Sequence, residues 1–147
     1  MRRLIIPDVN LLLYAYSEQT RLHEPAREWW ESLLNGTERV GVPWAVVVSF
    51  VRLMTNRSAV TNPITPTQAL DFVDEWFVRT HVLALNPSSR HLMFLRRNLM
   101  AAGVGGNLVS DAHIAALAME HQAEVHTNDR DFVRFPGLMW RNPIRVP

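Results

Sequence analysis

The amino-acid sequence predicts an α/β fold, with a central parallel sheet and helices on both of its faces. Short aliphatic and β-branched runs alternate with segments whose apolar residues recur at helical spacing. The 147 residues, of which 48% are hydrophobic and 20% charged, supply enough apolar side chains for one ordinary core. No internal repeat or linker interrupts the alternation, so residues 1–147 are expected to form a single domain.

The first half of the chain contains two predicted strands and three predicted helices. The first strand is a short aliphatic run that ends at Pro7. Pro25 occupies the first turn of a helix that Asn35 and Gly36 end, and Pro43 opens another. The strands are expected at residues 3–6 and 39–42, and the helices at residues 10–16, 24–34 and 43–55.

The second half continues the alternation. Thr65 and Pro66 open a helix with apolar residues at helical spacing. The three glycines at 103, 105 and 106 end one helix and form a loop before the next, and they do not follow a strand as a dinucleotide fingerprint would. Helices are expected at residues 65–77, 87–102 and 109–121, strands at 81–85 and 124–127, and turns with short extended segments at 135–147.

Four of the six aspartates lie where these elements begin or end. Asp8 follows the first strand, Asp111 opens a helix, and Asp129 and Asp131 follow the last predicted strand. The carboxyl ends of parallel strands meet at one edge of the sheet, so these carboxylates are expected to gather there. The dipole of its helix is expected to favour the ionised form of Asp111. Gathered carboxylates need a cation, and oxygen ligands suit Mg²⁺ or Mn²⁺. The arrangement is typical of a metal-dependent phosphodiester hydrolase.

Composition removes several other classes of site. The chain has no cysteine, which excludes disulfides, zinc–thiolate sites and thiol nucleophiles. All fifteen basic residues are arginine, so there is no P-loop or Schiff-base lysine. The net charge of +1 is too small to identify a nucleic-acid binder. The sequence contains no signal peptide and no apolar run that would span a membrane, so we expect a cytoplasmic protein.

The histidines and tryptophans give weaker indications. His113 and His121 lie near one face of a predicted helix, but no third nitrogen ligand has suitable spacing for zinc, and His126 is expected to be a partly exposed surface residue. Trp29 and Trp30 are adjacent on a helix, so one ring is expected to need cover from a partner. Five arginines are candidates for phosphate contacts: Arg52, Arg96, Arg97, Arg130 and Arg134.

Three segments together resemble the PIN-domain ribonucleases, and more narrowly the VapC toxins of bacterial toxin–antitoxin pairs. These segments are IIPDVNLLLYA, GGNLVSDAHIAALAMEH and HTNDRDFVRFPGLMWRNP. The resemblance implies a PIN-like, Rossmann-like three-layer α/β/α sandwich and cleavage of RNA that depends on Mg²⁺ or Mn²⁺. It also implies a VapB-like antitoxin partner and a homodimer.

The resemblance assigns roles to the aspartates. Asp8, Asp111 and Asp129 match three of the family's four acids and are the expected metal ligands, with Asp131 as an auxiliary catalytic residue. The second acid of the family, a glutamate, aligns with Ser49 in VPWAVVVSFVRLMTN, and no acid lies between Glu38 and Asp71. Asp131 is therefore a candidate for the missing charge, and Asn10 and Thr127 are candidates to orient the carboxylates.

The predicted function is that of a toxin endoribonuclease in which a metal-activated water attacks the RNA phosphodiester. The alternative is a catalytically weak or inactive PIN-like module that binds RNA or a protein, which the serine at position 49 favours. A phosphatase with Asp8 as its nucleophile would need a second aspartate two residues on and a lysine. The chain has Asn10 at that position and no lysine, which disfavours this third class.

Overall fold

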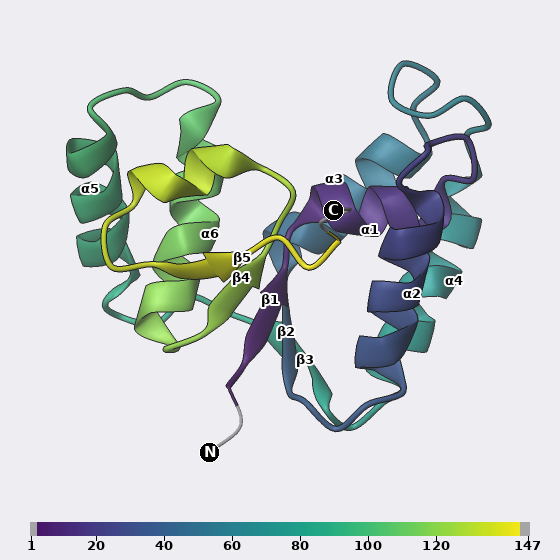
Figure 1. The fold of residues 1–147 in the computed structure, drawn as a ribbon, viewed down its shortest axis with the longest axis horizontal. Helices are drawn as coiled ribbons and strands as arrows, with labels where there is room; N and C mark the ends of the chain where they lie inside the picture. Colours follow the sequence, from purple (N-terminus) through teal and green to yellow (C-terminus); the bar gives the residue numbers. More distant parts are fainter. Residues whose placement is uncertain (1–2, 145–147) are drawn as a thin grey trace.

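Five parallel strands form the central sheet of the protein. The computed structural model describes residues 3–144 and places the strands in the order β3-β2-β1-β4-β5 (Figure 1). The strands are β1 (Ile5–Pro7), β2 (Val40–Pro43), β3 (Val82–Leu85), β4 (Glu124–His126) and β5 (Met139–Arg141). The helices are α1 (Val9–Tyr16), α2 (His23–Leu34), α3 (Trp44–Met54), α4 (Pro66–Phe77), α5 (His91–Ala102), α6 (Leu108–Glu120) and the short 3-10 helix η1 (Arg130–Arg134).

The strand order reverses between β1 and β4. The chain first builds outward from β1 through β2 to β3, and then crosses to the other side of β1 to form β4 and β5. Both neighbours of β1 pair with it in parallel, at Ile5 with Val40 and at Ile5 with Glu124. Open parallel sheets bind ligands at such a switch point, outside the carboxyl ends of the strands. The residues that follow β1 and β4 therefore lie where a functional site is expected.

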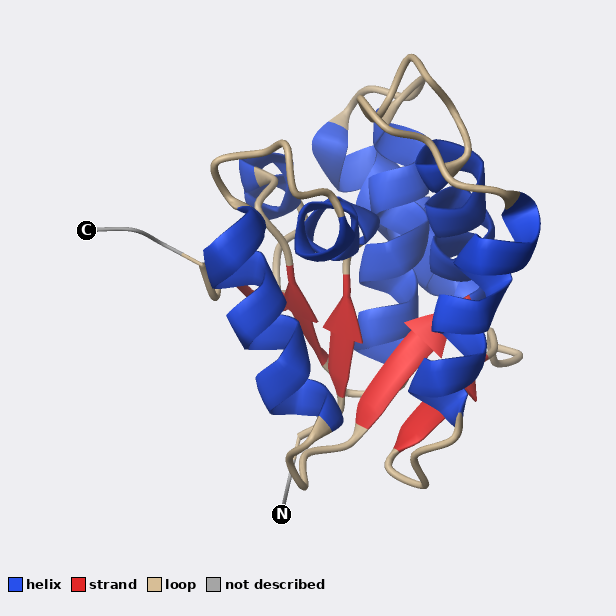
Figure 2. Cartoon of the chain, turned by 90° about the vertical axis from the view of Figure 1, so that its right-hand side faces the viewer, coloured by secondary structure: helices blue, strands red, loops and turns tan. Residues whose placement is uncertain are grey.

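Helices cover both faces of this sheet, as the sequence predicted. Figure 2 shows the strands as a layer with helices on either side. This arrangement confirms the three-layer α/β/α sandwich with a parallel sheet. No helix among residues 3–144 combines the length and the apolar character that crossing a membrane requires.

The Trp29–Trp30 pair on α2 is fully covered within the chain, so the expectation of one exposed ring is wrong. Trp30 is 2% exposed and packs edge-on against Trp76, while Trp29 is 9% exposed. Tyr16 accepts hydrogen bonds at its hydroxyl from the indole N–H groups of Trp30 (3.3 Å) and Trp76 (2.7 Å). Trp29 points instead to β4, where its N–H donates to His126. The two rings are buried because Trp30 packs against Trp76 on one side of α2 and Trp29 contacts His126 of β4 on the other.

Two elements differ from the prediction. Residues 139–141 form a fifth strand that pairs in parallel with β4, in a region expected to be mostly turns. The helix expected from residue 87 begins instead at His91. The residues before it form a turn, because the Ser88 backbone N–H donates to the buried Glu120 carboxylate and the Ser88 hydroxyl accepts from the Arg90 N–H (3.1 Å).

Candidate metal centre

Asp8 stands at the carboxyl end of β1 in a buried, hydrogen-bonded position. It is 7% exposed and caps α1, with Oδ1 accepting from the Val9 N–H at 2.8 Å. Oδ2 accepts from the Thr127 hydroxyl at 2.7 Å, and the Asp8 N–H donates to the His126 carbonyl at 2.9 Å. These bonds tie β1 to β4 across the switch point and fix the carboxylate in one orientation.

Thr127 links Asp8 to the loop that carries Asp129. Its hydroxyl oxygen accepts from the Asp129 N–H at 2.9 Å while its proton is donated to Asp8. Asn10 donates from its side-chain amide to the same hydroxyl at 3.4 Å. Thr127 thus contacts the Asp8 carboxylate directly, while Asn10 contacts Thr127 and no acidic side chain within the described part of the chain.

Asp111, Asp129 and Asp131 form the tightest acidic group among the described residues. One carboxylate oxygen from each lies within 4.8 Å of the other two. Asp111 comes from the first turn of α6, and the other two come from the turn that opens η1, where Asp129 Oδ1 accepts from the Asp131 N–H at 2.9 Å. Asp131 is exposed and lies 3.8 Å from Arg134, a weak surface ion pair.

The electrostatics of the four aspartates favour a bound cation. Burial raises the pKa of Asp111 to about 7, with further repulsion from Asp8 and Asp129 and a hydrogen bond with Asp129. Burial also raises the pKa of Asp8, although its hydrogen bonds with Thr127 and Val9 oppose the rise. Desolvation and like charge therefore outweigh the helix dipole, contrary to the expected preference of Asp111 for the ionised state. A divalent cation would relieve this repulsion, and a donor set of carboxylate oxygens suits Mg²⁺ or Mn²⁺.

Ser49 faces the same cleft as the acids. A cavity of about 340 Å³ is bordered by Asp8 and Asp111, and by Ala45, Val46 and Ser49 from α3. The position that the resemblance aligns with the family's second acid therefore opens onto the acidic site. No carboxylate from α3 reaches it.

A chain of three hydrogen-bonded groups, leading from buried Glu120 through His91 to His113 at the cleft, was not predicted. Glu120, at the end of α6, has a fully buried side chain and accepts from His91 Nδ1 at 2.6 Å. His91 Nε2 lies 2.8 Å from His113 Nδ1, and His113 borders the cleft beside Asp111. With the proton of His91 on Nδ1, His113 donates from Nδ1 and keeps an acceptor at Nε2. Burial lowers the pKa of His113, and repulsion from His91 adds to this effect.

This chain could not be found from sequence spacing. Glu120 looks like an ordinary helix-surface acid, and its partner His91 comes from a different helix. The available signal in the sequence was an acid, Glu120, that directly follows the apolar run 114–119 of α6.

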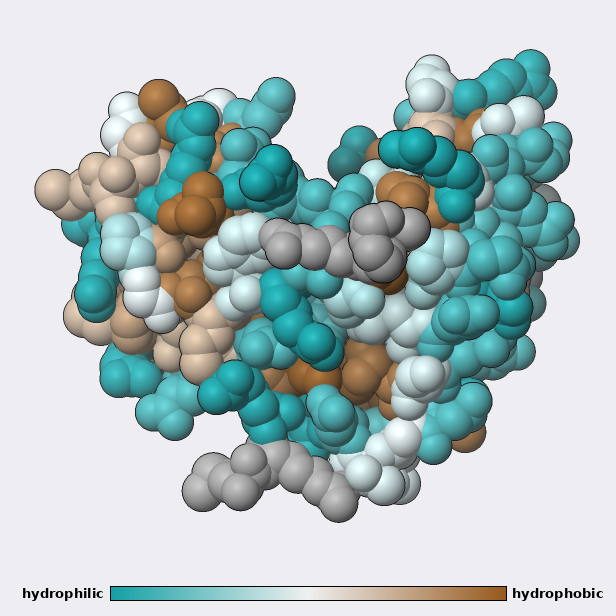
Figure 3. All heavy atoms as spheres, viewed as in Figure 1, coloured by the Kyte–Doolittle hydropathy of each residue, from teal (hydrophilic) through white to brown (hydrophobic). Residues whose placement is uncertain are grey.

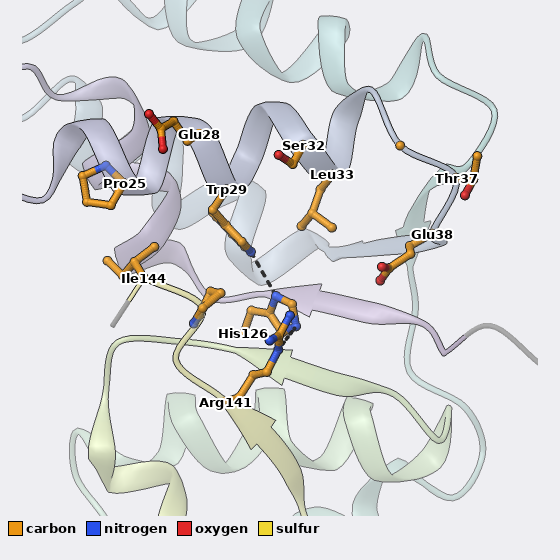
Figure 4. Close-up of a pocket in the computed structure, with 12 residues that line it drawn as sticks. Pro25, Glu28, Trp29, Ser32, Leu33, Thr37, Glu38, His126, Arg141 and Ile144 are labelled. Carbon is orange, nitrogen blue, oxygen red and sulfur yellow. Dashed lines mark hydrogen bonds between the residues drawn. The ribbon is translucent and has the colours of Figure 1, made fainter. Parts of the chain in front are cut away.

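His126 is 1% exposed, so the expectation of a partly exposed surface histidine is wrong. Its Nδ1 accepts from the Trp29 indole N–H at 3.0 Å, and Nε2 donates to Glu124 Oε1 at 2.9 Å. Burial lowers the pKa of His126. Figure 4 shows this contact at the floor of a cavity of about 690 Å³ between α2 and β5, with Arg141 beside the histidine. The ring is buried because α2 lies over the end of β4.

The structure thus brings three of the four predicted site residues into one group and places Asp8 beside them at the switch point. The assignment of Asp8, Asp111 and Asp129 as metal ligands remains a prediction, and the auxiliary acid Asp131 lies in the same group of carboxylates as Asp111 and Asp129. All five arginines expected near phosphate have exposed side chains: Arg52, Arg96, Arg97, Arg130 and Arg134.

Comparison with known proteins agrees with this architecture. The PIN domain family model matches residues 5–138. Ribonuclease VapC37 of Mycobacterium tuberculosis (strain ATCC 25618 / H37Rv) is 40% identical over 138 residues, which cover 94% of this chain and 96% of the relative. Ribonuclease VapC33 of Mycobacterium tuberculosis (strain CDC 1551 / Oshkosh) is 35% identical over 142 residues, covering 97% and 99%.

A solved structure shows the same fold. The toxin–antitoxin complex from Klebsiella pneumoniae contains a chain that matches 97% of this one, and 99% of its own length, with a TM-score of 0.60 and 16% identity. At that identity the match supports the fold alone. The family model and the sequence relatives go further: this chain belongs to the PIN-domain family and, within it, to the VapC ribonucleases.

Proposed function

We propose that this protein is an endoribonuclease that depends on Mg²⁺ or Mn²⁺ and acts as the toxin of a toxin–antitoxin pair. The observation that carries the proposal is the group of Asp111, Asp129 and Asp131, whose carboxylate oxygens lie within 4.8 Å of one another at the switch point. Family membership, with relatives named as ribonucleases, gives the reaction class.

Each acid has a distinct part in the proposed site. Asp111 and Asp129 hold the cation, with Asp8 as the third ligand from β1 and Asp131 as the auxiliary acid. Thr127 keeps the Asp8 carboxylate turned toward the site through its 2.7 Å hydrogen bond. A bound divalent cation supplies Lewis-acid chemistry, which makes water a competent nucleophile near neutral pH and stabilises charge on the phosphate. Exposed arginines such as Arg130 position the RNA backbone.

Protein partners belong to the same proposal. The partner is a VapB-like antitoxin, and the toxin forms a homodimer. The exposed apolar residues on α5, Leu92, Met93 and Met100, support contact with another protein because so many large apolar groups are seldom left in water. Figure 3 shows pale and dark brown residues gathered on this flank of the molecule.

Cleavage of a labelled single-stranded RNA in the presence and absence of Mg²⁺ or Mn²⁺ tests the enzymatic part. Wild-type protein should cut the RNA only with the metal, and Asp8→Asn and Asp111→Asn should each lower the rate by at least about a hundredfold, because even partners of metal ligands contribute tenfold or more. Asp71→Asn, an exposed change on α4, is the matched control and should retain the full rate. RNA binding without any cleavage would support the inactive module that Ser49 suggests. Equal rates in Asp8→Asn and wild type would remove Asp8 from the site.

A further inference from the structure

A second cavity lies beside the acidic group and is lined by four residues. They are Asn128, Arg130, Trp140 and Asn142, and the cavity has a volume of about 360 Å³. Asn128 and Arg130 flank Asp129 in the chain, so the cavity is lined from the same loop that carries this acid. Its size falls within the range of small-ligand sites and suits one nucleotide.

The sheet presents Trp140 and Asn142 together at this cavity. Side chains alternate along β5, so Trp140 faces away from Arg141, which lies with His126 on the side of α2. Asn142 follows on the same side as Trp140. Its amide donates to Asn128 Oδ1 at 2.8 Å, and its own oxygen accepts from the Ile144 N–H at 3.1 Å. These bonds hold both asparagine side chains in place and turn the Asn128 NH₂ group outward.

The lining of the cavity offers hydrogen-bond donors that have no partner, together with an aromatic ring. Within residues 3–144, the Asn128 NH₂ group, the Trp140 indole N–H and the Arg130 guanidinium have no hydrogen-bond or ion-pair partner. Trp140 is half-buried, with part of its ring surface open to the cavity. A ligand that matches this lining has a flat face, acceptor atoms and negative charge. A single RNA nucleotide has all three, since bases stack on aromatic rings and arginine binds phosphate.

We propose that this cavity binds one nucleotide of single-stranded RNA next to the cleaved phosphate, with its base on Trp140 and its phosphate on Arg130. Asn128 donates to an acceptor on the edge of the base. The proposal rests on the proposed ribonuclease function, because it takes RNA as the substrate. The acids repel the phosphate backbone, and Arg130 supplies positive charge at the point where the backbone passes Asp129.

Measurements of equilibrium binding separate the role of the Trp140 ring from that of the Arg130 guanidinium. The binding assay uses fluorescence anisotropy with Asp8→Asn protein in Ca²⁺, so that cleavage does not enter the measurement. Two probes are compared: a mixed-sequence RNA strand of about eight nucleotides, a length typical of single-strand sites, and an abasic sugar–phosphate strand of equal length. Trp140→Ala should weaken binding of the RNA about tenfold and leave the abasic strand unchanged. Trp140→Phe, which keeps an aromatic face, should retain most of the affinity for RNA.

Arg130→Gln should weaken both strands and reduce the salt dependence of binding by about one phosphate contact. Arg57→Gln is the matched control, because Arg57 is an exposed arginine on the loop between α3 and α4, and it should leave that dependence unchanged. The proposal is overturned if Trp140→Ala leaves RNA affinity unchanged, or if it weakens both strands equally. Cleavage by the wild-type protein is measured separately. A protein that does not cleave but shows the Trp140 effect would refute the ribonuclease and retain the nucleotide site.

Discussion

At the scale of single residues, the four aspartates differ in the burial and the hydrogen bonding of their carboxylates. Asp8 is buried, but two hydrogen bonds hold its carboxylate in place. Asp111 shares a hydrogen bond with Asp129, which requires a proton between two carboxyl groups. Asp131 is exposed to solvent and lies near Arg134. Burial raises the pKa of both Asp8 and Asp111, so without a cation both carboxylates carry an electrostatic cost.

The free energy of unfolding of the metal-free protein should depend on pH because of this electrostatic cost. The pKa of Asp111 is raised to about 7 from an ordinary value of 3.8, so the folded state binds its proton more tightly than the unfolded state. Its stabilising contribution is present below about pH 4 and is lost as the pH rises to about 7. We expect the free energy of unfolding of Asp111→Asn to increase relative to that of wild type between pH 5 and pH 8. Urea denaturation in the presence of a chelator measures this difference.

Asp71→Asn, exposed on α4, provides the comparison and should follow the wild-type curve. The lowered pKa of buried His126 acts in the opposite direction, because its contribution is present above its ordinary value of 6.5 and is lost as the pH falls below it. That slope is common to wild type and both variants, so it cancels in the difference. Parallel curves for wild type and Asp111→Asn would show that Asp111 is not desolvated in solution.

At the scale of elements, most of the helices and strands could be predicted because their signals are local. Thr65 and Gln68 form a complete capping box, and Pro43 directly precedes α3. The fifth strand could not be predicted, since residues 139–141 are exposed or half-buried and gain their strand structure from pairing with β4. The start of α5 at His91 also depends on a contact between elements, because Glu120 from α6 accepts a hydrogen bond from the turn before this helix.

The face of α3 that carries Ser49 decides whether an acid can be restored there. Ala45, Val46 and Ser49 all border the cleft with Asp8, so a side chain at position 49 points toward the acids. Ser49→Glu should tighten Mn²⁺ or Mg²⁺ binding by about tenfold, as one further carboxylate joins the donor set. Calorimetric titration measures the change, and the rate of cleavage need not rise, because added charge also repels the RNA.

Val48→Glu is the matched control for that titration. Val48 is the neighbouring residue on α3, is 63% exposed and points away from the cleft, so the same charge is added without reaching the site. Equal affinities for Ser49→Glu and wild type would mean that position 49 does not reach the metal. Asp131→Asn, tested in the same way, would then decide whether Asp131 is the fourth acid.

The contact between α5 and α6 makes a separate prediction about Glu120. Its buried carboxylate accepts from His91 Nδ1 and from the Ser88 N–H. In Glu120→Gln, one of these donors would face an NH₂ group, which should cost about 1–3 kcal/mol of unfolding free energy. Glu75→Gln, on the exposed side of α4, should cost little. An unchanged midpoint of denaturation for Glu120→Gln would indicate that His91 and Ser88 find other acceptors.

At the scale of the whole molecule, the site exists because of the strand order. Asp8 and Asp129 are far apart in sequence and meet only because β4 pairs with β1 at the switch point. The sequence was sufficient to predict this meeting, since strand ends and crossover rules depend on local patterns. The sequence was not sufficient to predict the contacts that surround the site. The burial of His126 by Trp29, and of Glu120 by His91, depends on contacts between distant elements that leave no periodic signal.

A cation at the switch point should therefore stabilise the entire fold, because its proposed ligands come from the end of β1, from α6 and from the turn after β4. Binding to the folded state alone adds about 2.7 kcal/mol at a metal concentration one hundred times the dissociation constant. Thermal denaturation with increasing Mn²⁺ or Mg²⁺ should raise the Tm of wild type and of Asp71→Asn alike, and should raise that of Asp111→Asn far less. In the absence of metal, Asp111→Asn should melt at a higher temperature than wild type, because the variant lacks the carboxylate whose pKa is raised by burial and by repulsion from the other acids. Equal metal-dependent shifts in wild type and Asp111→Asn would place the bound cation elsewhere on the protein.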